Sequence, residues 1–115
     1  MSGEAERERD ELPVTCDLAA LSAGQRERQR LLQRRLRTDV KEIRELSDGY
    51  AFHYTSEPSV LLTVAEFVTL ERLCCPFFDF GLDLERDGGP LWLRMTGGEE
   101  AKRVLEAGLA AVPES

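Results

Sequence analysis

Cys74 and Cys75 are adjacent in the sequence and are followed at once by Pro76, at the end of a strongly apolar stretch. The third cysteine of the chain, Cys16, lies near the N-terminus in an apolar-flanked run. Thiolates are preferred ligands of soft metal ions, while close thiols can also exchange electrons or simply fill a core. The three cysteines are therefore the main candidates for a functional site, and the rest of the sequence is needed to distinguish metal binding, redox chemistry and core packing.

Pro76 determines how the two adjacent thiols point. Neighbouring residues on an α-helix point about 100° apart, so two helical cysteines do not readily share one ion. Proline disfavours helical backbone at the residue before it, so we predict that Cys74 is the last helical residue and that Cys75 is extended. A disulfide between the two is disfavoured, because adjacent Cα atoms lie about 3.8 Å apart and disulfides need about 4.4 to 6.8 Å.

The residues around the cysteines favour some roles for the thiols over others, but they do not select one. Three thiolates suit a soft ion such as Hg(II), As(III) or Cu(I). Adding His53 gives the ligand count of a Cys₃His zinc site, but the spacing lacks paired zinc-binding knuckles, so zinc ranks below the soft ions. A thiol oxidoreductase ranks lower still, because a helix C-terminus disfavours a thiolate and no CxxC spacing is present. Buried cysteines that only pack the core remain an equal alternative.

Composition limits the class of protein. A chain of 115 residues, 42% of them hydrophobic, fits one domain with one core. The net charge of −7 argues against nucleic acid as a partner. No stretch approaches the roughly 18 apolar residues of a membrane span, and the charged N-terminus has no signal-peptide core. We therefore expect a cytoplasmic protein without a membrane partner, in which an odd number of cysteines favours free thiols or ligands over disulfides.

Hydrophobic periodicity divides the chain into a tail and a domain. Residues 1–12 lack apolar periodicity and are predicted to be a disordered acidic tail, and residues 13–112 a single domain. Ser22 and Gln25 match a capping box that begins a helix. Alternating segments at 40–46 and 50–55 flank an Asp-Gly turn, and a second alternating pair at 78–84 and 91–96 flanks another. Helices are predicted after each pair, from about 58 to 74 and from about 99 onward.

The order of these elements predicts the fold class. A leading helix is followed by two β-hairpin–helix units, and each hairpin has one apolar face. Such units form a four-stranded, mostly antiparallel sheet backed by helices, which is an α+β fold.

The segment from Glu71 to Phe77, which reads Glu-Arg-Leu-Cys-Cys-Pro-Phe, resembles a group of small bacterial proteins that share a Cys-Cys-Pro-Phe core. The same resemblance includes two further segments, Val-Thr-Cys-Asp-Leu at residues 14–18 and Leu-Ser-Asp-Gly-Tyr at residues 46–50. It spans roughly residues 14–107. Some members of this group are associated with heavy-metal regulators of the mercury-resistance type. The resemblance implies Cys16, Cys74 and Cys75 as the matching thiols and brings no settled activity.

These observations lead to one principal hypothesis and two alternatives. The principal hypothesis is a non-enzymatic protein that binds a soft metal through Cys74 and Cys75, with Cys16 as third ligand, for sequestration, delivery or sensing. The first alternative is a protein-interaction module, partnering a transcriptional regulator, in which the cysteines are core packing. A thiol oxidoreductase is the enzymatic alternative, and no catalytic residue or resident cofactor is assigned.

Overall fold

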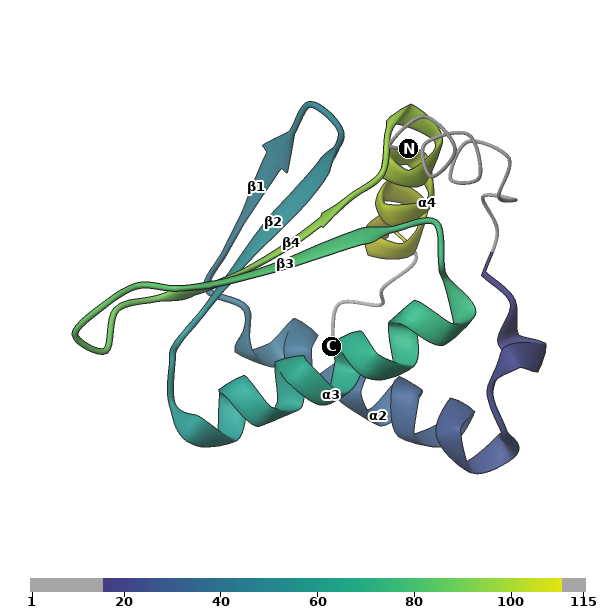
Figure 1. Ribbon diagram of the computed structural model, residues 1–115, viewed down its shortest axis with the longest axis horizontal. Coiled ribbons are helices and arrows are strands. Elements are labelled where there is room, and N and C mark those ends of the chain that lie inside the picture. The colour runs from purple at the N-terminus through teal and green to yellow at the C-terminus, as the bar shows by residue number, and fades with distance from the viewer. Residues whose placement is uncertain (1–15, 111–115) are drawn as a thin grey trace, which may run out of the picture.

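A computed structural model describes residues 16–110, and the predicted tail 1–12 and the domain end at 112 lie outside these residues. Figure 1 shows the arrangement of the helices and strands. Their order along the chain is η1 (Leu18–Ala20), α2 (Ala23–Asp39), β1 (Glu42–Leu46), β2 (Gly49–Tyr54), α3 (Pro58–Cys74), β3 (Asp79–Leu84), β4 (Leu91–Thr96) and α4 (Glu99–Ala110).

The strands form one antiparallel sheet in the order β1-β2-β4-β3. Each hairpin contributes one central and one edge strand, and the two hairpins meet where β2 pairs with β4. A helix precedes the first hairpin and another follows each hairpin, with α2 and α3 packed side by side (Figure 1). The predicted α+β fold with two β-hairpin–helix units is confirmed.

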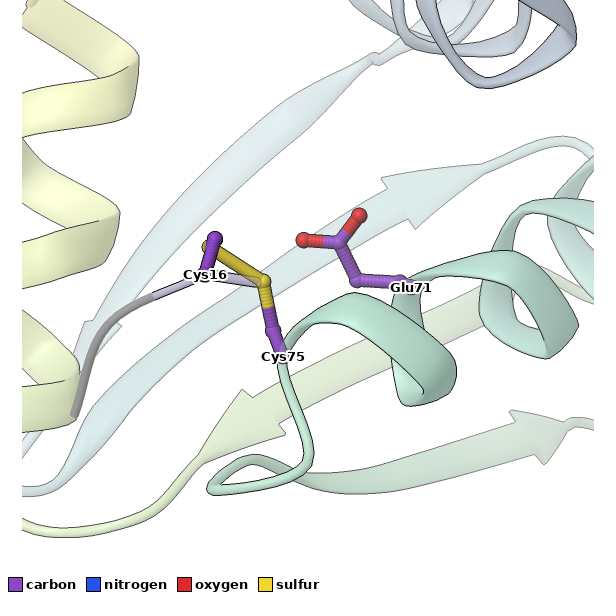
Figure 2. A group of neighbouring side chains, drawn as sticks. All are labelled: Cys16, Glu71 and Cys75. Atoms are coloured by element: carbon purple, nitrogen blue, oxygen red, sulfur yellow. A yellow bond between two sulfur atoms is a disulfide. The ribbon is translucent and has the colours of Figure 1, made fainter. Parts of the chain in front are cut away.

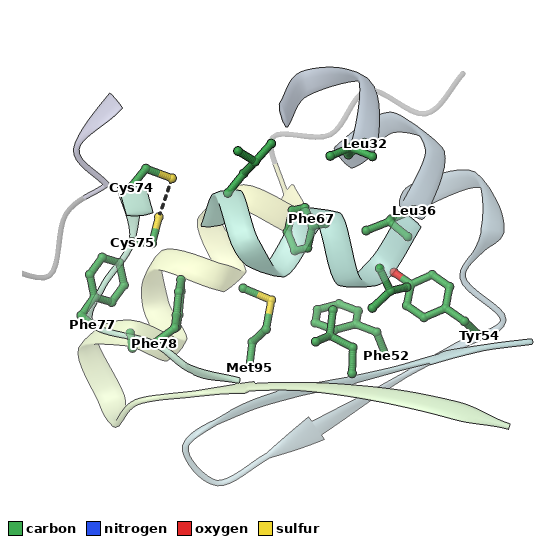
Figure 3. Close-up of a cluster of buried hydrophobic side chains, with 14 of the residues drawn as sticks. Leu32, Leu36, Phe52, Tyr54, Phe67, Cys74, Cys75, Phe77, Phe78 and Met95 are labelled. Carbon is green, nitrogen blue, oxygen red and sulfur yellow. Dashed lines mark hydrogen bonds between the residues drawn. The ribbon is translucent and has the colours of Figure 1, made fainter. Parts of the chain in front are cut away.

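The core lies between the helices and one face of the sheet. Phe52 and Tyr54 of β2 alternate with residues of the opposite face, and the register pairs Phe52 with Leu93 of β4. Phe67 of α3 and Met95 of β4 belong to the same buried cluster, and Figure 3 shows their side chains in the space between helix and sheet. Helix α4 joins this core through Ala101, which is buried. The core is therefore one continuous apolar layer, as a small domain requires.

The helix boundaries follow local signals in the sequence. Ser22 caps α2 by accepting a hydrogen bond from the backbone N–H of Gln25, whose side chain in turn accepts from the Ser22 N–H, so the predicted capping box is confirmed. Helix α3 begins at Pro58 and ends at Cys74, as predicted. The first strand starts at Glu42 rather than residue 40, because Val40 caps α2.

The apolar face of β3 is less well covered than its alternation indicates. Leu82 retains 41% of its surface and Leu84 53%, although both share a face with the half-buried Phe80. The reason is position: β3 is an edge strand, and the buried contacts concentrate on the central strands β2 and β4. Leu62 of the mainly apolar helix α3 is also at the surface and is 70% exposed.

Candidate thiol site

The adjacent cysteines lie on opposite sides of a helix boundary, as Pro76 predicts. Cys74 is the last residue of α3, and Cys75 has a non-helical backbone with φ of −127° and ψ of 67°. The turn brings the two Sγ atoms within 3.6 Å of each other, which Figure 3 marks with a dashed line. Both side chains are buried, so the pair lies inside the protein at the end of the helix.

Cys16 is brought to this pair from 59 residues away. It forms a disulfide with Cys75, with a Cα–Cα distance of 4.6 Å (Figure 2). The neighbouring residue contributes to the same contact, because the Asp17 backbone N–H donates to the Cys74 carbonyl at 2.6 Å. That bond satisfies a carbonyl at the helix end, where intrahelical partners run out. The segment before η1 is thus attached to the end of α3 both covalently and by the backbone.

The disulfide differs from the expectation of three free cysteines. Among the described residues only Cys74 is free, since Cys16 and Cys75 are bonded to each other. The sequence disfavoured a Cys74–Cys75 bond on geometric grounds but did not place Cys16, whose approach depends on the contact between the η1 segment and α3. Sulfur atoms in a disulfide are not thiolates, so binding of a soft ion by all three requires reduction of this bond first.

Glu71 lies beside the sulfur atoms and was not among the predicted site residues. One of its carboxylate oxygens and the Sγ atoms of Cys16 and Cys75 all lie within 4.8 Å of one another, and Figure 2 shows the carboxylate pointing toward the disulfide. The residue is only 7% exposed, and burial raises its pKa from 4.5 to about 7. The sequence carries a signal for this position, because residues three apart on a helix are neighbours and Glu71 precedes Cys74, the last helical residue, by three.

Gln29 of α2 completes the buried polar cluster. Its Nε2 donates to the Glu71 carboxylate and lies 3.9 Å from Cys74 Sγ. The side chain is 3% exposed, and its Oε1 has no hydrogen-bond partner among the described residues. A buried unpaired oxygen is costly and rare, so the polar groups around the sulfur atoms are not fully satisfied in this state.

The free thiol of Cys74 is poorly suited to nucleophilic chemistry. Burial raises its pKa to about 11, and the nearby carboxylate of Glu71 acts in the same direction. At neutral pH the group is therefore a thiol, whereas reactive cysteines carry lowered pKa values. Its hydrogen bonds agree with this state, because Cys74 Sγ lies 3.7 Å from the Glu71 carbonyl oxygen. This geometry weakens the alternative of a thiol oxidoreductase that uses Cys74 as nucleophile.

His53 is not part of the cluster. It lies on the opposite face of β2 from Phe52 and Tyr54, and its ring stacks on Trp92 with 4.9 Å between ring centroids. The Arg44 guanidinium covers the same Trp92 ring at 4.5 Å. The structure thus separates the histidine from the three cysteines, and a Cys₃His zinc site cannot form in this fold.

No family model, no curated protein and no solved structure matches this chain. In the part of the chain that the structure describes, no helix is long and apolar enough to cross a membrane.

Proposed function

We propose that the protein binds a soft, thiophilic metal or metalloid ion through Cys16, Cys74 and Cys75 once the Cys16–Cys75 disulfide is reduced. The observation that carries the proposal is that Cys75 Sγ meets both other sulfur atoms: it is bonded to Cys16, 59 residues earlier, and lies 3.6 Å from Cys74 Sγ. Binding of the ion would serve its sequestration, delivery or sensing. The resemblance to proteins associated with heavy-metal regulators adds a metal-responsive regulator as a partner in the same proposal.

The sulfur spacing supports a shared ion. Two ligands about 2.3 Å from one metal, at a tetrahedral angle, lie about 3.8 Å from each other. The Sγ atoms of Cys74 and Cys75 are 3.6 Å apart, so both fit one ion without a change of backbone. Reduction leaves Cys16 Sγ beside Cys75 as the third ligand, while the Asp17–Cys74 backbone bond still holds this segment in place.

The surroundings of the cluster favour a soft ion over a hard one. The site offers sulfur atoms and one buried carboxylate, whereas hard cations need several oxygen ligands. A bound cation would also deprotonate the Cys74 thiol and offset the negative end of the α3 dipole. Cys74 and Cys75 are buried, whereas Cys16 is exposed, so an ion could enter the site from the Cys16 side.

Metal titration of the reduced protein tests the proposal. The protein is reduced, freed of reductant without oxygen, and titrated with Hg(II), As(III), Cu(I) and Zn(II), with native mass spectrometry giving the stoichiometry. We expect one soft ion per chain and weaker binding of Zn(II). The oxidised protein is the matched control, since the same chain then has only Cys74 free.

Single cysteine variants separate ligands from core packing. Replacing any one of the three by serine should weaken As(III) binding at least about tenfold, because a trithiolate site loses one of its bonds. If the variants bind as tightly as the parent and lose only stability, the cysteines are core residues and the proposal is wrong.

An interaction module is the second candidate, and exposed apolar side chains favour it. Leu62 on α3 and Leu82 and Leu84 on β3 all lie at the surface. Arginine-rich α2 offers a further contact surface, since Arg30, Arg34 and Arg35 are exposed. Exposed apolar groups of this kind often mark protein contacts. Substituting Leu62 and Leu82 by serine should abolish regulator binding if this candidate is correct, and leave metal binding intact.

A further inference from the structure

A cavity of about 260 Å³ adjoins the sulfur cluster. It lies between α2, α3, α4 and the apolar face of the sheet, and most of its wall is apolar. Phe52, Phe67 and Met95 line it, and Cys16 and Glu71 form the part of the wall next to the disulfide. Figure 3 shows the three apolar side chains between sheet and helix. A thiol site and an apolar space thus share a boundary at Cys16.

We propose that this cavity receives the organic group of a monosubstituted arsenic(III) compound whose arsenic is bound by Cys16 and Cys75. The inference rests on the proposed function and names its ligand class. Such a compound needs only two thiolates, because its organic group occupies the third position on arsenic. Cys16 and Cys75 already have their sulfur atoms in direct contact, and Cys16 also faces the cavity.

The binding reaction is a ligand exchange without net oxidation. Reduction of the disulfide first uses two electrons and two protons from a dithiol reductant and yields two thiols. An arylarsonous acid, R–As(OH)₂, then loses both As–O bonds and forms two As–S bonds. Each departing hydroxide takes one thiol proton and leaves as water, and arsenic stays in the +3 state. Cys74 takes no part in this exchange.

The size of the cavity sets the size of the organic group. A dry cavity of about 150 Å³ lined by Leu, Ile and Phe binds benzene. The cavity here measures about 260 Å³, which is enough for one ring and below the roughly 300 Å³ at which pockets for drug-sized ligands begin. One phenyl ring or a small alkyl group therefore fits, whereas two linked rings, at about 150 Å³ each, do not.

Two arsenicals with different thiol requirements test the inference on the reduced, full-length protein. The probes are arsenite, which forms three As–S bonds, and phenylarsine oxide, which forms two. We expect Cys74→Ser to weaken arsenite binding at least about tenfold and to change phenylarsine oxide binding less than about threefold. Cys16→Ser should weaken both. If Cys16→Ser leaves phenylarsine oxide binding unchanged while Cys74→Ser abolishes it, the arsenic is held at the other sulfur pair and the inference is overturned.

A cavity-filling variant tests where the ring goes. Val104→Phe enlarges a side chain of α4 that lines the cavity, and Ala107→Phe makes a similar change at an exposed position of the same helix. Val104→Phe should weaken phenylarsine oxide binding roughly 10- to 100-fold, the range set by the apolar surface of one ring. Arsenite binding should be unchanged in both variants. Equal phenylarsine oxide affinity in the two variants overturns the inference.

A measurement on the unmodified chain keeps the test independent of how the variants fold. A biphenyl arsenical should bind more weakly than phenylarsine oxide, because its second ring has no space. Tighter binding of the biphenyl compound contradicts the inference. The proposed function fails separately, if the reduced parent protein does not bind arsenite at all.

Discussion

Two glutamates of α3 meet neighbouring residues of α2 in opposite environments. Glu66 pairs with Arg28 at 2.7 Å, and both side chains are largely in water. Glu71, five residues later, accepts from the uncharged amide of Gln29 and is buried beside the sulfur atoms. The Arg28 hydrogen bond lowers the pKa of Glu66, whereas burial raises that of Glu71 to about 7.

This contrast indicates what each contact does. An exposed ion pair fixes the packing of two helices at little cost, since solvent screens both charges. A buried carboxylate without a cation is destabilising, and proteins retain such groups mostly where they are used. The Glu71 end of the α2–α3 contact is therefore where the proposed thiol site lies, whereas the Glu66 end is an exposed ion pair.

The largest expected effect comes from the covalent link at the Glu71 end. Cys16→Ser removes the disulfide, which closes a loop of 59 residues. In the chain-entropy model, closing a loop of that length contributes about 4 kcal/mol to the free energy of unfolding. We expect urea unfolding of the oxidised protein to show a loss of this size. Parent and variant should unfold alike under reducing conditions, and equal stability of the oxidised forms would contradict the disulfide's role.

The second-largest effect is expected when the buried carboxylate of Glu71 is replaced. The folded state binds the Glu71 proton more tightly than the unfolded state, so its contribution is complete below about pH 4.5 and is lost as the pH rises to about 7. Replacing Glu71 by Gln keeps an acceptor for Gln29 and removes the charge. The variant should match the parent near pH 4 and exceed it by about 3 kcal/mol near pH 8 in urea unfolding. A difference that does not change with pH would show that Glu71 is not buried as described.

The smallest effect is expected at the exposed pair. Arg28→Ala removes the cation, so the pKa of Glu66 should rise toward its ordinary value of 4.5. Because the folded-state pKa is lowered in the parent, the pair contributes stability above the ordinary pKa, and this is lost as the pH falls. We expect a small, salt-sensitive change in urea unfolding and a clear shift of the Glu66 carboxyl titration by NMR. If Arg28→Ala lowered the free energy of unfolding as much as Cys16→Ser, the Glu66 and Glu71 ends of the α2–α3 contact would not differ as described.

Much of the fold could be predicted because its signals are local. Ser22 and Gln25 specify the start of α2 through bonds spanning three residues. The break between Cys74 and Cys75 follows from the ring of Pro76 alone, since proline restricts the preceding residue whatever surrounds it. The first hairpin closes through Ser47 and Asp48, one residue earlier than the Asp-Gly pair predicts, and Gly49 is the first residue of β2, opposite Leu46.

The candidate site could be predicted only in part. Its three cysteines are evident from composition, but Glu71 reads as an ordinary charge on an otherwise apolar helix. Gln29 likewise occupies one position of an arginine-rich stretch. Burial distinguishes both from their neighbours, and burial depends on how α2 packs on α3.

By itself the sequence determined the element order, the α+β class, the helix end at Cys74 and the re-aimed Cys75. Backbone sterics and short-range hydrogen bonds act within a few residues and do not need the rest of the chain. Only the tertiary structure decided the Cys16–Cys75 bond, the raised pKa of Glu71 and the cavity beside them. These properties arise from contacts between segments far apart in the sequence, whose distances and exclusion of water exist only once the helices have packed on the sheet.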